Sequence, residues 1–261
     1  MELSSAISAV VTGGASGLGA GTARALAAKG VRVGLLDLNE AQGQAVAAEI
    51  GGTFARCDVT DEASVDEALK TVRLAHGQER ILVNCAGIVI GKRTVRKDRE
   101  TGASVAHDVA SFAKVIQVNL IGTFTMMSKC AAGMTGLNPL NDDGERGVII
   151  STASVAAEDG QIGQVAYAAS KGGVQSMTLP VARDLSKDGI RVAAILPGLF
   201  HTPMFDQLPE DARQSLAASV PFPSRLGRPD EYARMAVDIC ENVMLNGVSI
   251  RLDGAIRLAP R

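Results

Sequence analysis

Three side chains in the middle of the sequence are of types that can move a proton. Tyr167 and Lys171 stand four residues apart, and Ser154 lies thirteen positions before Tyr167. On a helix, residues at i and i+4 share a face about 5–6 Å apart, so the Lys171 ammonium would favour the phenolate of Tyr167. A free tyrosine has a pKa of roughly 10, whereas a general acid or base works best nearer the operating pH. The same spacing also fits an ordinary pair on a helix surface, so the elements around the pair must decide between the two.

A glycine-rich turn near the start of the chain predicts a site for phosphate groups. It begins at Thr12, after a short apolar segment, and leads into a helical one. Glycines there let the backbone approach a pyrophosphate, which then lies on the helix N-terminus. The residues of this turn that we expect to contact a dinucleotide are Gly13, Ser16, Gly17, Leu18 and Gly19.

The end of the second predicted strand indicates which dinucleotide is bound. Asp37 stands there, twenty-four residues after Gly13. A carboxylate at this place can accept hydrogen bonds from ribose hydroxyls and would repel a 2′-phosphate. No arginine directly follows Asp37 that could form an ion pair with that phosphate. The pattern predicts NAD rather than NADP, although Asp37 could also be a simple turn residue.

The ends of the third and fourth predicted strands carry further candidates. Asp58 and Val59 follow the third strand, where a carboxylate could reach the adenine amino group. Asn84, Ala86 and Gly87 follow the fourth, where small residues would let the backbone pass close to a ribose. Alternatively, Asp58 caps the helix that begins near residue 62, and the small residues only form a turn.

The rhythm of the whole sequence predicts an α/β fold. Short apolar segments alternate with longer helical ones, and the apolar segments are too hydrophobic for a sheet with one wet face. We expect one doubly wound domain over residues 1–261, with a parallel sheet covered by helices on both sides. The predicted strands are residues 9–12, 32–37, 52–57, 81–84, 147–151, 190–196 and 248–252. The predicted helices are residues 18–29, 40–49, 63–76, 111–134, 165–185 and 230–241.

Two segments interrupt this rhythm. Residues 91–108 are polar and charged without a clear period, and residues 199–229 are rich in proline. Long loops inside a compact domain are often functional, and ligands of open α/β sheets bind beyond the carboxyl ends of strands, where both segments begin. We predict that both are substrate loops, with a disordered excursion as the alternative for residues 91–108.

Composition excludes several classes of function. A net charge of −2 gives no electrostatic footprint for nucleic acid, and no run approaches the 18 apolar residues of a membrane span. The cysteines and histidines lack the spacing of metal ligands, which predicts reduced thiols and no metal. The first predicted strand lies so near the start that we expect no targeting leader and a cytoplasmic location.

Taken together, these motifs resemble those of the short-chain dehydrogenase/reductase family. The matching residues span nearly the whole chain and are Thr12 to Gly19, Asn84 to Gly87, Asn119, Ser154, Tyr167, Lys171 and Pro197-Gly198. The resemblance implies a Rossmann-like domain with a seven-stranded parallel sheet, assembled into a homotetramer or a dimer. It also implies an oxidoreductase that uses a nicotinamide cofactor.

The resemblance assigns roles to the proton-moving residues. Tyr167 would exchange a proton with the substrate hydroxyl or carbonyl, and Ser154 would orient that oxygen. Lys171 would lower the pKa of Tyr167 and hold the nicotinamide ribose. Asn119 would keep a helix locally open and support a water-mediated proton path through Lys171.

The resemblance also places residues at the nicotinamide end of the cofactor. Thr202 would contact the carboxamide, and Pro197 and Gly198 would lie at the same end of the cofactor.

Four stretches, residues 148–157, 177–185, 221–227 and 246–257, resemble a narrower group within the family. Its members use NAD to oxidise 3-hydroxyacyl-CoA, 2-methyl-branched 3-hydroxyacyl-CoA and some hydroxysteroids. We therefore expect a small-molecule substrate, with an acyl-CoA thioester as the leading candidate. Glu158 departs from this group, because an acyl or steroid wall should be apolar there. The basic run Lys92–Arg99 could meet CoA phosphates.

Three alternatives stay open. The chain could reduce 3-oxoacyl thioesters on acyl carrier protein, although Asp37 disfavours the NADPH that this role commonly uses. It could be a hydroxysteroid dehydrogenase. It could also be a dinucleotide-binding scaffold without catalysis, but such a protein would be expected to lose Tyr167 or Lys171.

Overall fold

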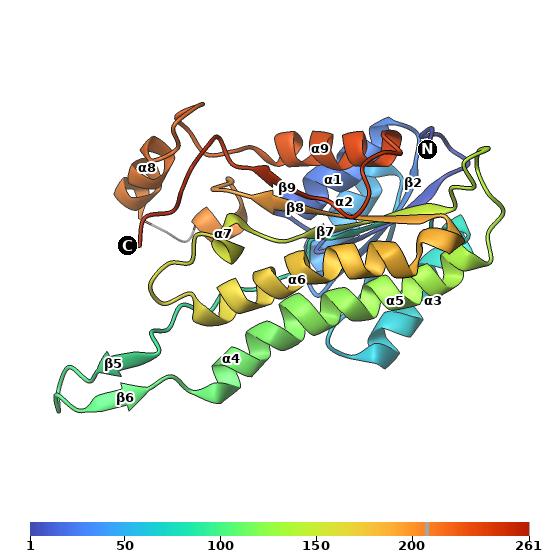
Figure 1. Ribbon diagram of the computed structural model, residues 1–261. Coiled ribbons are helices and arrows are strands. Elements are labelled where there is room, and N and C mark those ends of the chain that lie inside the picture. Colours follow the sequence, from blue (N-terminus) through green and yellow to red (C-terminus); the bar gives the residue numbers. More distant parts are fainter. Residues whose placement is uncertain (207–208, 261) are drawn as a thin grey trace.

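A seven-stranded parallel sheet forms the centre of the computed structural model, which describes residues 1–206 and 209–260 (Figure 1). The strand order is β3-β2-β1-β4-β7-β8-β9, and every neighbouring pair is parallel. The strands are β1 (Ser8–Thr12), β2 (Arg32–Asp37), β3 (Thr53–Arg56), β4 (Ile81–Asn84), β7 (Gly147–Thr152), β8 (Ile190–Pro197) and β9 (Ser249–Leu252). The chain builds outward from β1 to β3 and then restarts on the other side at β4. That reversal opens a crevice at the carboxyl ends of β1 and β4.

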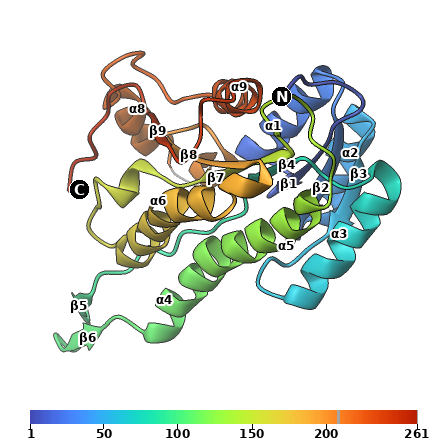
Figure 2. The same ribbon diagram turned by 45° about the vertical axis from the view of Figure 1, so that its right-hand side comes forward.

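Helices cover both faces of the sheet, as the sequence predicts (Figure 2). On one face the core contains residues of α1 (Gly17–Ala28), α2 (Glu40–Ile50) and α9 (Pro229–Glu241). On the other it contains residues of α3 (Glu62–His76), α5 (Thr123–Thr135) and α6 (Val165–Asp184). All residues of β1, β4 and β8 are buried. This two-sided burial explains why these strands are apolar throughout rather than alternating.

The helix predicted at residues 111–134 is not uniform. It consists of α4 (Val109–Ile116), a π-helical stretch η1 (Gln117–Gly122) and then α5. Asn119 lies inside the π-helical stretch, so the local opening that the family resemblance implied is present. The continuous stretch Val109–Thr135 is long and apolar enough to cross a membrane, with a mean hydropathy of 1.3. That is weak support for a span, because core helices pass the same test and its α5 part packs on the sheet through Met126, Met127, Cys130 and Met134.

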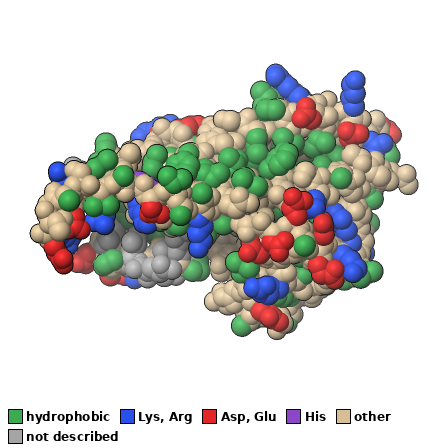
Figure 3. All heavy atoms as spheres, turned by 90° about the horizontal axis from the view of Figure 1, so that it is seen from below, with side chains coloured by type: hydrophobic (Ala, Val, Ile, Leu, Met, Phe, Trp, Pro, Cys, Tyr) green, Lys and Arg blue, Asp and Glu red, His purple; other side chains and the backbone are tan. Residues whose placement is uncertain are grey.

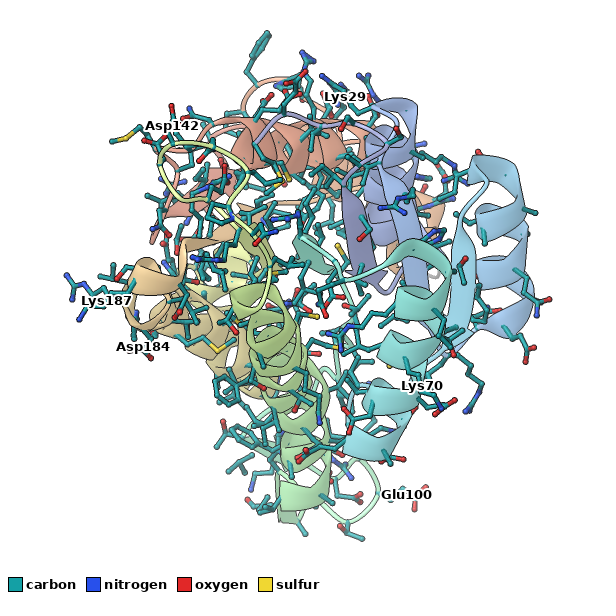
Figure 4. All side chains as sticks on the ribbon, turned by 90° about the vertical axis from the view of Figure 1, so that its right-hand side faces the viewer. Lys29, Lys70, Glu100, Asp142, Asp184 and Lys187 are labelled. Atoms are coloured by element: carbon teal, nitrogen blue, oxygen red, sulfur yellow. The ribbon has the colours of Figure 1, made fainter. Side chains whose placement is uncertain are left out.

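Residues 91–108 form a hairpin rather than an irregular loop. Its antiparallel strands are β5 (Val95–Lys97) and β6 (Ser104–Ala106). The hairpin projects beyond α4, and Glu100 in its turn points away from the body of the molecule (Figure 4). We expected no regular structure because strands of three residues, exposed except for the half-buried Val105, leave no hydrophobic period to detect. At its base, the Lys92 amide donates to the Gly163 carbonyl oxygen at 2.8 Å.

The second interrupting segment, residues 199–229, also contains regular structure. It carries two short helices, α7 (Pro203–Asp206) and α8 (Glu210–Ala218). Residues 207–208 within it lie outside the described part of the chain. The His201 amide donates to the Gly227 carbonyl oxygen at 2.8 Å, so the two ends of the segment meet beyond β8.

Candidate active site

A cavity of about 920 Å³ lies at the carboxyl edge of the sheet. Residues from the ends of β1, β2, β4, β7 and β8 line it together with the start of α6. The predicted residues in its lining are Gly13, Ser16, Gly17, Leu18, Gly19, Asp37, Asp58, Val59, Ala86, Gly87, Ser154, Tyr167, Lys171, Pro197, Gly198 and Thr202. Asn84 and Asn119 are not part of the lining. The fold thus brings together residues that are up to 189 positions apart in the sequence.

The glycine-rich turn makes the cradle that a pyrophosphate requires. Gly13 has a φ of +63°, and a Cβ there would lie 2.8 Å from backbone atoms of Cys85 and Ala86. A Cβ on Gly19 would lie 2.1 Å from the Gly13 carbonyl oxygen, so this close approach also requires glycine. The side chain of Ser16, the N-cap of α1, makes no capping hydrogen bond, and the first turn of α1 has no acidic residue. The N-terminus of α1 therefore keeps its amide groups and positive dipole for an anion.

Asp37 lies at the end of β2 beside this turn. Its Oδ2 accepts from the Ala15 amide at 3.0 Å, and its Oδ1 accepts from the Asn39 amide at 2.9 Å. The second bond is the turn role that we considered, and the first ties the carboxylate to the cofactor cradle. Each carboxylate oxygen can still accept a further hydrogen bond, so ribose hydroxyls fit here.

Asp58 follows β3 on the same side of the cavity. Its Oδ1 accepts from the backbone and the hydroxyl of Thr60, at 2.9 and 2.7 Å, and these bonds lower the pKa of the carboxyl. The capping alternative is wrong, because Asp61 is the residue that caps α3, accepting from the Ala63 amide. Val59 lies against Gly122 of η1, where a Cβ would meet its side chain at 2.7 Å.

Asn84 does not face the cavity. Its side chain is buried, and its Nδ2 donates to Ser151 Oγ on β7 at 3.3 Å. It therefore cross-links two strands behind the site. The backbone that borders the cavity is held instead by Thr12, whose Oγ1 accepts from the Cys85 and Ala86 amides at 3.2 Å. We assigned no role to Thr12, although its position directly before Gly13 is the signal that could have revealed it.

The proton-moving residues come together beside β7 and α6. Tyr167 and Lys171 are one turn apart on α6, and Lys171 Nζ lies 5.8 Å from the centre of the Tyr167 ring. Ser154 directly precedes the short helix η2 (Val155–Ala157), and its Oγ accepts from the Ala156 amide at 3.1 Å. Ser154 also hydrogen-bonds with Tyr167. Ser154 and Lys171 are buried, and Tyr167 is partly exposed to the cavity.

Burial dominates the electrostatics of this group. It raises the pKa of Tyr167, and the hydrogen bond from Ser154 opposes that shift. Burial also lowers the pKa of Lys171 to about 8, against a smaller opposing effect of Cys85. Lys171 Nζ donates to the Thr152 carbonyl oxygen at 2.6 Å. The shift in the pKa of Tyr167 arises from burial and from Ser154, and the expectation that Lys171 lowers this pKa stays a prediction.

Asn119 connects the π-helical stretch to both sides of the site. Its side chain accepts from the Ile88 amide and donates to the Ile88 carbonyl, both at 2.8 Å. Its Nδ2 also donates to Ser170 Oγ at 3.0 Å, and Ser170 in turn donates to the Tyr167 carbonyl at 2.8 Å. Asn119 thus fixes the loop after β4 against the catalytic helix, and the proton path through it stays a prediction.

Glu158 and Asp159 do not face the cavity. Glu158 pairs with Arg251 on β9 at 2.5 Å, and Asp159 pairs with the same guanidinium at 2.7 Å. Gln175 donates to the other oxygen of Glu158 at 2.8 Å. The departure that we noted at Glu158 therefore does not place an acid in the substrate wall, because both acids are ion-pair partners of Arg251. The apolar side chains that line the cavity include Ile88, Val89, Phe200 and Phe205.

The polar lining residues that sequence reasoning missed include Lys114 and Gln117 on the α4–η1 helix. One helical turn separates them, a spacing too common to have marked them. Within residues 1–206 and 209–260, no cluster of three or more His, Cys, Asp or Glu could hold a metal ion.

Comparisons with known proteins agree with this geometry. The short chain dehydrogenase family profile matches residues 8–213. The chain is 51% identical to 3-hydroxyacyl-CoA dehydrogenase type-2 of Drosophila melanogaster over 96% of this chain and 97% of that protein. It is 50% identical to the Homo sapiens protein of the same name, over 97% of this chain and 95% of that protein.

More distant and structural matches point the same way. A 3-oxoacyl-acyl-carrier-protein reductase of Thermotoga maritima is 32% identical over 95% of this chain and 96% of its own length. The crystal structure of 3-hydroxyacyl-CoA dehydrogenase type-2 from Mycobacterium avium superposes with a TM-score of 0.91 at 41% identity, covering 98% of both chains. These matches, together with the cofactor cradle and the Ser-Tyr-Lys group described above, mean that this chain belongs to the short-chain dehydrogenase family.

Proposed function

We propose that the protein is an NAD-dependent dehydrogenase that oxidises the 3-hydroxyl group of 3-hydroxyacyl-CoA thioesters to the 3-oxo thioester. The observation that carries this function is the convergence of Ser154, Tyr167 and Lys171 on one cavity with a dinucleotide cradle. The substrate class rests on the similarity, near 50% identity over almost the whole chain, to proteins named for this activity.

The protein's own residues divide the work. Ser154 and Tyr167 lie at one wall of the cavity, where they can hold the oxygen of the substrate alcohol. Tyr167 accepts the hydroxyl proton, and Lys171 keeps a positive charge next to the resulting phenolate. A bound nicotinamide would supply a second positive charge and would take up the hydride.

Asp37 supports NAD as the cofactor rather than NADP. Its carboxylate ends β2 at the cavity, and the next residue, Leu38, is uncharged and exposed. A 2′-phosphate placed at this position would meet a carboxylate and no cation from β2. This argument also disfavours the reduction of 3-oxoacyl groups on acyl carrier protein, the role of the Thermotoga maritima relative by its name.

The hairpin β5–β6 is suited to the phosphates of CoA. Its base is bonded to Gly163, four residues before Tyr167, so it stands beside the substrate entrance. Lys92 is already paired with Asp108 at 2.6 Å, and Arg96 lies 3.7 Å from Asp98. Arg93 and Arg99 are exposed, and no described residue forms an ion pair with them. These two arginines are therefore cations that can meet an anionic substrate.

The outer side of the α4–α5 helix supports assembly with further copies of the chain. Apolar side chains gather on this face (Figure 3). Among them Ile121 and Phe124 are 43% and 52% exposed, and Leu179 on the neighbouring α6 is 43% exposed. A second copy that buried this strip would form part of the expected homotetramer. Light scattering of the purified protein tests this, and a monomer mass would contradict it.

A cytoplasmic location is also proposed, and the four free cysteines fit a reducing compartment.

The decisive experiment follows NADH formation with three alcohols: a straight-chain 3-hydroxyacyl-CoA, its 2-methyl-branched form and a hydroxysteroid. The proposal expects the highest kcat/KM with a CoA thioester, and with NAD over NADP. A clear preference for the steroid would select the hydroxysteroid alternative. No turnover of any alcohol, despite NADH binding, would select the non-catalytic scaffold.

A further inference from the structure

A line of hydrogen bonds leads from helix α9 to the ammonium group of Lys171. Tyr232 on α9 places its hydroxyl 2.7 Å from Thr152 Oγ1 at the end of β7. The carbonyl oxygen of the same Thr152 accepts a hydrogen bond from Lys171 Nζ at 2.6 Å. The Thr152 residue is therefore held by its side chain and holds Lys171 by its backbone.

The direction of each bond follows from the available protons. Thr152 Oγ1 lies 2.6 Å from the Asn84 carbonyl oxygen, which can only accept, so the Thr152 proton is used there. Tyr232 must then donate its own proton to Thr152 Oγ1. The Cys85 thiol lies 3.5 Å from Thr152 Oγ1 and 3.8 Å from the Tyr232 oxygen, and it can donate its proton to either. In both cases the Tyr232 proton goes to Thr152 Oγ1, and the Thr152 proton goes to the Asn84 carbonyl oxygen.

Packing alone does not require the Tyr232 hydroxyl. The side chain is fully buried, and its ring packs edge-on against Phe200 with centres 6.5 Å apart. Phenylalanine would fill the same space without burying a polar group, which costs free energy unless it is hydrogen-bonded. Tyr232 is also absent from the cavity lining, so it touches neither cofactor nor substrate there.

We propose that Tyr232 and Thr152 are positioning residues for Lys171, and that the Tyr232 hydroxyl keeps the Thr152 carbonyl aimed at the ammonium. The role rests on the proposed function, since it is Lys171 that supports the Tyr167 phenolate. Without the Tyr232 bond, the Thr152 hydroxyl is held on one side only, and the carbonyl loses part of its fixed orientation. The ammonium of Lys171 is then less well stabilised.

The expected effect on pH dependence has a definite sign. Among the described residues, the titratable groups around Lys171 are Cys85 after β4 and Tyr167 on its own helix. Tyr232 on α9 reaches it only through Thr152. A carbonyl that accepts from the ammonium favours the charged form of Lys171. Loss of that acceptor makes Lys171 deprotonate at lower pH, and Tyr167 then ionises at higher pH.

The composition offers a direct reading of this change. The chain contains two tyrosines, Tyr167 and Tyr232, and no tryptophan. In the Tyr232→Phe variant, tyrosinate absorbance in the near ultraviolet reports Tyr167 alone. In the wild type, burial raises the pKa of Tyr232 well above its ordinary value, so Tyr232 adds no tyrosinate absorbance near neutral pH. Titration with saturating NAD therefore compares Tyr167 in both proteins.

We expect Tyr232→Phe to shift the Tyr167 titration and the acid limb of the kcat profile upward by about 0.5 in pH. At fixed neutral pH, kcat should fall by up to about threefold with little change in the affinity for NADH. Thr152→Val should do the same, and Thr152→Ser, which keeps the hydroxyl, should restore the wild-type profile. If Thr152→Val does not fold, Tyr232→Phe still carries the test because it keeps the ring.

Thr178→Val is the matched control. Thr178 is equally buried on α6, and its hydroxyl donates to the Val174 carbonyl oxygen, far from Lys171 in the hydrogen-bond network. It should leave both profiles unchanged. An unshifted Tyr167 titration in folded Tyr232→Phe would overturn the proposal. The absorbance titration needs no substrate, so a wild type that fails to oxidise 3-hydroxyacyl-CoA would overturn the proposed function and leave this test intact.

Discussion

The cofactor side and the substrate side of the cavity are built in different ways. On the cofactor side, buried strands deliver Gly13 and Asp37 to fixed places, and the Ala15 amide ties the turn to Asp37. On the substrate side, the hairpin has strands of only three residues, and its base is joined to the body through Lys92 and Gly163. The sheet therefore positions the cofactor-binding residues rigidly, whereas the peripheral segments that face the substrate are held by fewer contacts and can differ between enzymes with different substrates.

The largest effect is expected where the two sides meet. Tyr167→Phe should lower kcat by about 10³-fold, because it removes the group that accepts the substrate proton. NADH binding, measured by fluorescence, should stay close to wild type, since the ring and Lys171 remain. Retained turnover would show that another group takes the proton and would break the assignment of Tyr167.

The next effect lies on the cofactor side. Asp37→Ala should raise kcat/KM with NADP by about tenfold or more, because a carboxylate that repels the 2′-phosphate is removed. Asp58→Ala is the matched control: it also removes a carboxylate from the cavity lining, but at the end of β3. If both variants changed the preference for NAD over NADP equally, Asp37 would not be the residue that excludes the 2′-phosphate.

A third prediction concerns the buried ammonium of Lys171 in the protein without cofactor. Its pKa is lowered by burial to about 8 from the ordinary 10.5. Between these values the unfolded chain holds a proton that the folded protein has released, so folding stability gained from this group rises with pH. The advantage of Lys171→Met over the wild type in urea unfolding should shrink by about 1–2 kcal/mol from pH 7.5 to 9.5. A constant difference would mean that Lys171 is well solvated.

The smallest effect is expected on the substrate side. Replacing Arg93 and Arg99 by serine should raise KM for a 3-hydroxyacyl-CoA by about twofold to fivefold at low salt, and less at high salt. The corresponding pantetheine thioester, which lacks the nucleotide phosphates, serves as control and should show no change. An equal rise for both thioesters would mean that the hairpin shapes the entrance rather than binding phosphate.

Much of the cofactor side could be predicted from the sequence because its signals are local. The glycine turn, Asp37 and the spacing of Tyr167 and Lys171 each reside in a few consecutive residues. The hairpin escaped prediction because its short, exposed strands carry no hydrophobic period. Asn84 was assigned to the cofactor from its motif, yet the neighbouring strand β7 turns its side chain inward to Ser151.

The sequence by itself determined the alternating α/β plan, the dinucleotide cradle and the identity of the proton-moving residues. Only the tertiary structure decided which groups surround them. Arg251 draws Glu158 away from the substrate wall from 93 residues along the chain, and Tyr232 reaches Thr152 from 80 residues away. Such partners meet only when separate strands and helices pack, because burial forces each polar group to find whichever partner the fold places beside it.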